Sequence, residues 1–403
     1  MIANNFRKKR TLIYKGASNQ IKKPSFYKRA TNWISKSLKR ACMVIGALFL
    51  VYTVFSIASL LFIMNGASVK TMSDKSVLLL KIEGNIPEVR GGGDISEILN
   101  KSGSTLDEII TAIDVASRDD RIKGLVLSLR SANISLTQAQ EIRNAVLEFR
   151  KSGKFTTAYS VSYGDGGSGL TRYYLASAFD TIWMQPIGIV SISGFNAEMP
   201  YFKELLDKVG VKGHFLQRKE YKTAMENITN SSMSKYNRET LETIIDDFYN
   251  EIGSDIAENR EIDKDVFFEL MDKGLFVDVD AQETGLVDRL GYGDMVVSEI
   301  KMDLDNDPES ENVEFVTIRS YYKNFANDVV KKESLDKEKE LVAVVHINGA
   351  IVQSAKGGSP LGGGSNVAAA SVISGVLYDI ADDEEIKVVL LRVNSPGGSP
   401  AAS

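Results

Sequence analysis

The chain has 403 residues, of which 43% are apolar and 25% are charged, and its net charge is −5. Of the 48 basic residues, 12 precede position 65, whereas none of the 53 acidic residues does, so the remainder has a net charge of −17. This acidic remainder argues against nucleic acid as a partner, and it is long enough to bury one large core or two ordinary ones. The single cysteine, Cys42, excludes an intrachain disulfide.

The N-terminal region predicts a membrane anchor. Residues 1–40 form a basic tail, and the 24 residues from Ala41 to Met64 carry no formal charge. At about 1.5 Å per residue, such a helix spans roughly 36 Å and crosses a bilayer. A cleaved signal peptide would have a shorter apolar region and a clear cleavage site, for which Asn65–Ala67 is a poor candidate. We therefore predict a retained transmembrane helix with residues 1–40 in the cytoplasm and the rest in the periplasm.

A repeat organises the rest of the chain. The segment 81–86 returns as 346–351 at an offset of 265 residues, and 119–127 returns as 383–391 at an offset of 264. Two matches in the same order and nearly the same register predict a duplicated module. Two unrelated α/β domains that share common patterns are the alternative.

Each copy has the pattern of a strand, a glycine-rich loop, an amphipathic helix and a strand. In the first copy, Thr105 to Glu108 predicts a capping box that opens a helix, and Leu125 to Leu129 suits a buried strand. Further along we expect strands at 155–159 and 181–184, a loop at 164–169, and helices at 173–178 and about 238–259. Alternating strands and helices predict an α/β fold with crossover connections.

The domain boundaries follow from this pattern. We predict a first repeat at 65–300, a connection at 301–338, which is polar and rich in acidic residues, and the start of a second repeat at 339–403. Because the second repeat is much shorter than the first, we expect the chain to be a C-terminally truncated fragment.

The histidines limit the possible chemistry. The chain has only His214 and His346, and each lies in an apolar stretch where a structural role is expected. No spacing of cysteine, histidine or acidic residues indicates a metal site, and the sequence has no phosphate-binding loop motif. A nucleophilic mechanism would therefore need another base, and lysine is the known substitute.

The strongest local signal follows the predicted strand at 387–391. Pro396 removes a backbone donor, while Gly397 and Gly398 allow conformations and close approaches that a Cβ would block. Backbone N–H groups are then free to face a ligand oxygen, as an oxyanion hole requires. A simple tight turn is the alternative.

Two motifs resemble a known family. Val393 to Ser399 resembles the signature of the signal peptide peptidase SppA family, which belongs to the ClpP/crotonase-like superfamily, and Tyr221 to Ala224 resembles the segment that carries the general-base lysine in the long, duplicated SppA form. Further similarities lie at 173–177, 182–183, 205–208 and 320–322. The resemblance runs from the anchor to residue 403 and implies a ClpP/crotonase-like tandem repeat, with an incomplete second copy, behind one transmembrane helix.

The resemblance also assigns roles. Lys222 would be the general base, Gly398 would donate its N–H to the oxyanion, and the nucleophilic serine would lie beyond Ser403, so the 403 residues alone would be inactive. Because a lysine is protonated at neutral pH, the site must desolvate it or crowd it with positive charge. In the first copy, residues 130–134 occupy the place of the glycine turn, so the first copy has no such turn. This suggests that the first repeat supplies the base and the second repeat supplies the oxyanion turn.

The resemblance finally implies a biological setting. We expect a serine endopeptidase, anchored in the bacterial inner membrane, that degrades cleaved signal peptides without a cofactor and assembles as a homotetramer. A catalytically inactive SppA-like protein that binds or scaffolds at the membrane is the alternative, and an Ala-Ser-Gly-Gly segment in the complete reading frame would separate the two. A crotonase-type acyl-CoA enzyme is a second rival, against which the export signal counts.

Overall fold

The structure, a computed structural model, describes residues 43, 46, 48–56, 72–89, 103–165, 169–334, 340–354 and 367–403. Its contacts divide the chain into two units, Met1–Lys70 and Thr71–Ser403. The basic tail and most of the predicted transmembrane segment lie outside the described residues, and the described part of that segment is helical. Within the ranges given above, no helix is both long enough and apolar enough to cross a bilayer.

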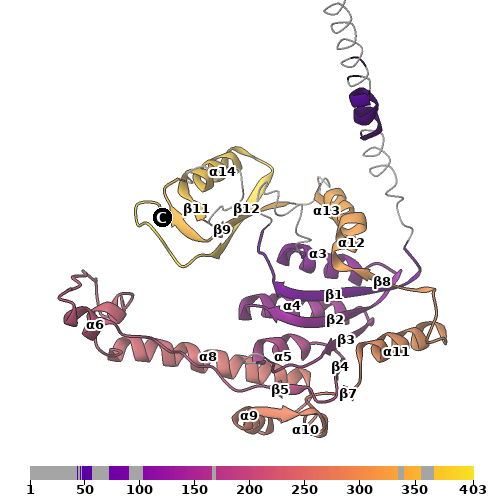
Figure 1. Cartoon of the computed structure of the whole chain (residues 1–403), viewed down its shortest axis with the longest axis horizontal. Coiled ribbons are helices and arrows are strands. Elements are labelled where there is room, and N and C mark those ends of the chain that lie inside the picture. Colours follow the sequence, from indigo (N-terminus) through magenta and orange to yellow (C-terminus); the bar gives the residue numbers. More distant parts are fainter. Residues whose placement is uncertain are drawn as a thin grey trace, which may run out of the picture. The chain divides into compact units, whose positions relative to one another are not determined.

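The unit Thr71–Ser403 contains a six-stranded sheet whose neighbouring strands are all parallel (Figure 1). This confirms the predicted α/β fold, since parallel neighbours need crossover connections. The strand order is β7 (Arg289–Leu290), β4 (Thr181–Met184), β3 (Phe155–Ser160), β2 (Ile122–Asn133), β1 (Lys75–Asn85) and β8 (Val313–Thr317).

The two faces of this sheet bury different clusters because strand side chains alternate. On one face, Leu78 and Leu80 pack with buried side chains of α3 (Leu106–Ser117), α4 (Leu136–Arg150) and α5 (Leu170–Ala176). On the other face, Val77 and Trp183 pack with α11 (Gly293–Asp305). Helices on both faces explain why the central strands read as nearly continuous apolar runs.

Capping boxes start two of the helices. The predicted box at α3 is confirmed, because Thr105 Oγ1 accepts from Glu108 N at 3.3 Å and the Glu108 carboxylate accepts from Thr105 N at 3.2 Å. A second capping box starts α4 with Ser135 and Gln138. Each box satisfies backbone donors that a helix N-terminus otherwise leaves unpaired.

The segment between β4 and β7 contains short elements and one long helix. The long helix α8 covers 25 residues, and its buried apolar side chains, Ile252, Ile256 and Ala257, lie toward its C-terminal end. The elements are β5 (Ile189–Ser191), which pairs antiparallel with β6 (Leu275–Val277), and the helices α6 (Lys203–Lys208), α7 (Glu226–Thr229), α8 (Lys235–Asn259), α9 (Lys264–Lys273) and α10 (Asp278–Glu283).

The segment 301–338, which the sequence predicts to be a connection, contains regular structure in addition. Strand β8 lies within it and pairs with β1, so part of this segment is an edge of the main sheet. Val313 and Val316 are buried there, and the acidic run that precedes them conceals this short strand in the sequence. After β8 come α12 (Ile318–Tyr321), the π-helix η1 (Tyr322–Ala326) and α13 (Asn327–Ser334).

A second, smaller strand pair follows. Strand β9 (Leu341–Asn348) pairs in parallel with β12 (Ile386–Asn394), and α14 (Ala370–Asp382) lies between them in the chain. A separate parallel pair joins β10 (Ala350–Val352) to β11 (Val367–Ala369). Unlike β2, β12 exposes most of its side chains.

The two long strand pairs share a register. Leu80 lies opposite Leu127 in the first pair, and Val345 lies opposite Leu391 in the second. These positions differ by 265 and 264, which are the offsets of the sequence repeat. Each pair also has a register shift at which one lysine, Lys123 or Lys387, has no partner residue in the other strand. Lys123 Nζ donates to Asp120 O at 2.7 Å, and Lys387 Nζ donates to Glu384 O at 2.6 Å. Both the lysines and the acceptors are 264 positions apart.

Candidate active site

The glycine turn after β12 has the backbone that its sequence predicts. Gly397 has φ +101°, a backbone conformation that residues with a Cβ rarely adopt. The Gly397 N–H donates to Ser395 Oγ at 3.1 Å, so the Ser395 side chain supports the turn.

Gly398 forms a parallel bridge with Ile351 of β10. The Ile351 N–H donates to Gly397 O at 3.0 Å, and the Ser399 N–H donates to Ile351 O at 2.9 Å. In such a bridge the central residue points its own N–H away from the partner strand. Within the described residues the Gly398 N–H has no acceptor. It can therefore donate to a ligand oxygen, as an oxyanion hole requires.

Close packing explains why this position is a glycine. A Cβ on Gly398 would lie 2.0 Å from Ile351 O and 2.7 Å from the Ile351 carbonyl carbon. The position 264 residues earlier is Ile134, which is buried, and the preceding Asn133 donates through Nδ2 to Asn85 Oδ1 at 2.6 Å. The first strand pair therefore ends without a glycine turn.

Lys222 lies in an irregular stretch between α6 and α7, and its side chain is exposed. Within the described residues its Nζ has no hydrogen bond or ion pair. The neighbouring Tyr221 anchors the stretch to α8, because its hydroxyl donates to Glu239 at 3.1 Å and its ring packs edge-on against Tyr236. Lys222 is therefore not desolvated in this single chain.

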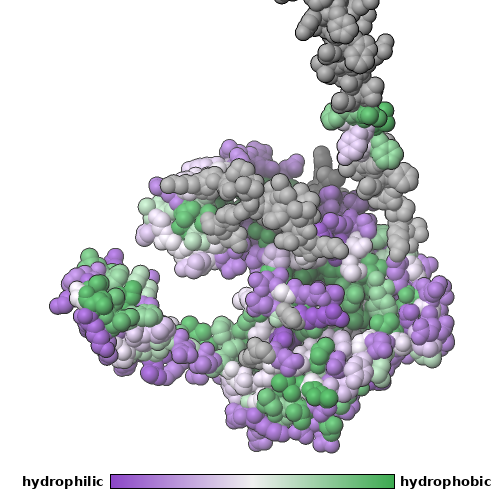
Figure 2. Space-filling view, in the orientation of Figure 1, coloured by the Kyte–Doolittle hydropathy of each residue, from purple (hydrophilic) through white to green (hydrophobic). Residues whose placement is uncertain are grey.

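The region around Lys222 also exposes many apolar side chains. Figure 2 shows hydrophobic surface near α6. The side chain of Leu216 is completely exposed, and other exposed apolar residues in this region include Leu205, Val209, Val211, Phe215, Tyr221, Met225, Ile244 and Phe248. We call the segment 202–248 the exposed segment.

The structure does not join the two predicted site residues directly. Among the described residues, no hydrogen bond or ion pair connects 218–226 to 394–399. His346 is half-buried on β9, as expected, whereas His214 is exposed in an irregular stretch and not in the core. The centre of the predicted loop 164–169 lies outside the described residues.

The fold and these residues suit one class of protein. A parallel α/β sheet, a glycine amide without an acceptor among the described residues and a candidate lysine base are the features expected of a hydrolytic enzyme with an oxyanion turn.

Comparisons with known proteins specify this class. Peptidase family S49 matches residues 148–307, a range that includes Lys222. Protease 4 of Haemophilus influenzae is 28% identical over 381 residues, which cover 90% of this chain and 59% of that protein. The chloroplastic serine protease SPPA of Arabidopsis thaliana is 24% identical over 318 residues, which cover 77% of this chain and 44% of that protein. The chain thus spans about three fifths of the first relative and less than half of the second.

A solved structure is also similar. A mutant of the 1510-N membrane-bound stomatin-specific protease in complex with a substrate peptide aligns with a TM-score of 0.35 at 12% identity, over 63% of this chain and 98% of that chain. The chain is thus similar to SppA-like serine proteases over most of its length, and its residues 148–307 match peptidase family S49.

Proposed function

We propose that the protein is a serine-type endopeptidase with a Ser/Lys dyad. The unpaired N–H of Gly398 carries this proposal, because it is a preorganised donor at the exit of a parallel strand. Lys222 takes the proton of the serine hydroxyl, whose oxygen bonds to the peptide carbonyl carbon while Gly398 holds the oxyanion. Lys222 then returns the proton to the leaving amine, and water hydrolyses the acyl-enzyme. The nucleophile is the serine expected beyond Ser403, so this mechanism concerns the complete protein.

The two strand pairs are copies in this proposal. Their common register, their bulges at the same place and the matching bonds of Lys123 and Lys387 support a duplication. Bulges are commonly kept within families. The copies divide the work, since Lys222 lies in the first and Gly398 in the second.

The exposure of Lys222 is consistent with assembly as a homotetramer. A protonated, hydrated lysine is a poor base, and burial by a second subunit would lower its affinity for the proton. The apolar side chains of the exposed segment are suited to such a contact, since large exposed apolar patches mark interaction sites. Light scattering in detergent tests this part, and a monomeric complete protein would contradict it.

The substrate and the location follow from the proposed anchor. A transmembrane helix at 41–64 would hold the enzyme in the bacterial inner membrane, with the peptidase in the periplasm. Cleaved signal peptides are apolar segments left in that membrane, and an extended peptide can pair with a strand edge through its backbone.

A peptidase assay on the complete protein in detergent tests the proposal. Lys222→Ala should abolish cleavage of a signal-peptide substrate, while Lys212→Ala, which changes another exposed lysine of the same irregular stretch, should leave it intact. Full activity in Lys222→Ala would eliminate the assignment. A complete wild-type protein that cleaves no peptide would favour the inactive, membrane-tethered alternative.

A further inference from the structure

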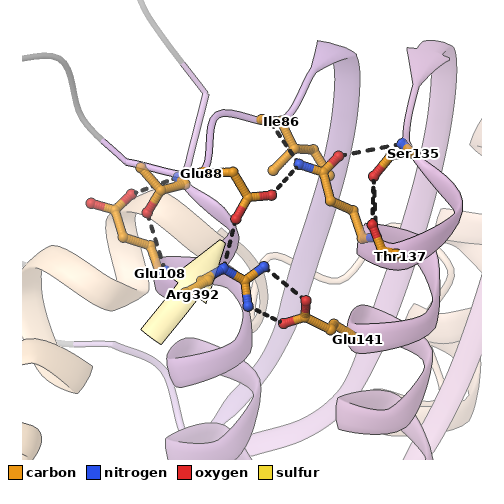
Figure 3. Close-up of polar contacts among 9 residues, drawn as sticks. Ile86, Glu88, Glu108, Ser135, Thr137, Glu141 and Arg392 are labelled. Atoms are coloured by element: carbon orange, nitrogen blue, oxygen red, sulfur yellow. Dashed lines mark hydrogen bonds and ion pairs between the residues drawn. The ribbon is translucent and has the colours of Figure 1, made fainter. Parts of the chain in front are cut away.

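Arg392 lies on β12, six positions before Gly398, and its side chain leaves its own strand pair. Its guanidinium reaches Glu88, which follows β1, and Glu141 of α4 (Figure 3). Arg392 Nε donates to Glu88 Oε2 at 2.7 Å, and its two terminal nitrogens donate to the two carboxylate oxygens of Glu141 at 2.8 and 2.7 Å. The contact with Glu141 is the two-pronged arrangement that makes arginine–carboxylate pairs strong and directional.

These contacts are partly shielded from water. The side chain of Glu88 is 9% exposed, and those of Arg392 and Glu141 are 30% and 35% exposed. The hydrogen bond to Glu141, with a further contribution from Glu88, raises the pKa of Arg392 against the opposing effect of burial. A shielded pair with this geometry holds its partners more firmly than an exposed surface pair does.

The first repeat, 65–300, which we call the first module, holds Glu88 in place. Gln138 Nε2 donates to Glu88 Oε1 at 2.7 Å and to Ile86 O at 3.0 Å. The Gln138 carbonyl accepts from Ser135 N at 3.3 Å within the capping box of α4. The start of α4 and the end of β1 therefore fix the carboxylate that receives Arg392 Nε.

Backbone pairing does not set the position of β12 against the first module. Strands β9 and β12 form their own two-stranded sheet, separate from the six-stranded one. In the shared register, Arg392 lies opposite His346 and corresponds to Ser128, which lies opposite Lys81. Strand β2 forms with a serine at this position, so an arginine is not needed for β12 to form. The arginine therefore has another role.

We propose that Arg392 is a positioning residue, which fastens β12 to Glu88 and Glu141 and thereby fixes the Gly397–Gly398 turn relative to the first module. For its catalytic consequence this inference rests on the proposed function, in which the first module carries Lys222. Lys222 and the Gly398 N–H must then stay at a fixed distance and orientation, because a displacement of about 1 Å can lower the rate roughly a hundredfold.

The first test measures position and needs no activity. Spin labels at Asp120→Cys and Glu384→Cys, two exposed positions in a Cys42→Ser background, report the distance between the modules. Arg392→Met and Glu141→Gln should shift and broaden the distance distribution. Glu148→Gln, which breaks an exposed pair with Lys151 on the same helix, should not. Unchanged distributions in both test variants would overturn the inference, and Glu141→Gln keeps it testable if Arg392→Met does not fold.

The second test measures catalysis in the complete protein. Arg392→Met should lower kcat roughly a hundredfold with little change in KM, and Arg392→Lys should restore only part of it because an ammonium cannot make the two-pronged contact. An unchanged kcat beside an active wild type would overturn the positioning role. If the wild type cleaves nothing but the distances respond to Arg392→Met, the peptidase proposal fails while the link between the modules stands.

Discussion

Gly398→Ala is the substitution for which the structure predicts the most specific outcome. The new Cβ would meet Ile351 O at 2.0 Å, where ordinary contact begins at about 3.4 Å. The neighbouring atoms are backbone, so no side chain can rotate away. The strain can be relieved only if the turn separates from β10.

Two opposing terms decide the outcome. Overpacking destabilises the closed turn by about 1 to 3 kcal/mol, and separation relieves this strain. Separation also breaks the hydrogen bonds Ile351 N to Gly397 O and Ser399 N to Ile351 O, each of which contributes about 1 kcal/mol to the closed turn. The substitution therefore shifts the balance toward the open turn by about 1 to 3 kcal/mol, acts locally and does not unfold the main sheet.

Amide hydrogen exchange measures this opening. Exchange at Ile351 and Ser399 should accelerate by about tenfold to a hundredfold, since about 1.4 kcal/mol corresponds to a factor of ten. Gly375→Ala is the matched control, because the glycine lies in α14 with open space around it and alanine favours the helix. In the complete protein, Gly398→Ala should reduce kcat by about two to three orders of magnitude. Unchanged exchange at both amides would refute the steric argument.

Three further outcomes are expected. Lys222→Ala should change the free energy of unfolding of the 403-residue chain by less than about 0.5 kcal/mol in urea denaturation, because the side chain is exposed and makes no hydrogen bond or ion pair with the described residues; a larger loss would contradict that position. Burial alone would raise the pKa of Asp119, but hydrogen bonds from Arg121 and Tyr321 outweigh it and hold the pKa below its usual range. The resulting stability is present above about pH 4 and lost as pH falls, so the deficit of Asp119→Asn should shrink in acid, and an equal deficit at pH 7 and pH 3 would be inconsistent with this. Thr105→Ala should cost about 1 kcal/mol through the lost helix cap, which Thr105→Ser should restore; equal stability of both variants would show that the cap contributes nothing.

Local patterns predicted much of the first module. Strand β4 has the predicted bounds, and the capping box at Thr105 is present, because both depend on neighbouring residues. Strands β3 and β12 also lie where the apolar runs placed them. Such elements need only a short window of sequence, in which periodicity separates strand from helix.

Long-range features could not be predicted in this way. The partners of Arg392 lie 304 and 251 residues away in the chain, and no local pattern links a carboxylate to a guanidinium at that distance. Strand β8 is five residues long and follows an acidic run, so its place beside β1 depends on tertiary packing. The exposure of Lys222 likewise depends on which surfaces the fold covers, and motif resemblance carries no information on that.

The uncovered strand β12 has a practical consequence. Its run Val388–Leu391 has no charge and high β propensity, and in the described part of the chain β12 pairs only with β9. Such runs recruit strands from other molecules and lead to aggregation. Lys387 and Arg392 flank the run as gatekeepers, so replacing Arg392 removes one of the two charges that keep copies of the chain apart in concentrated solution.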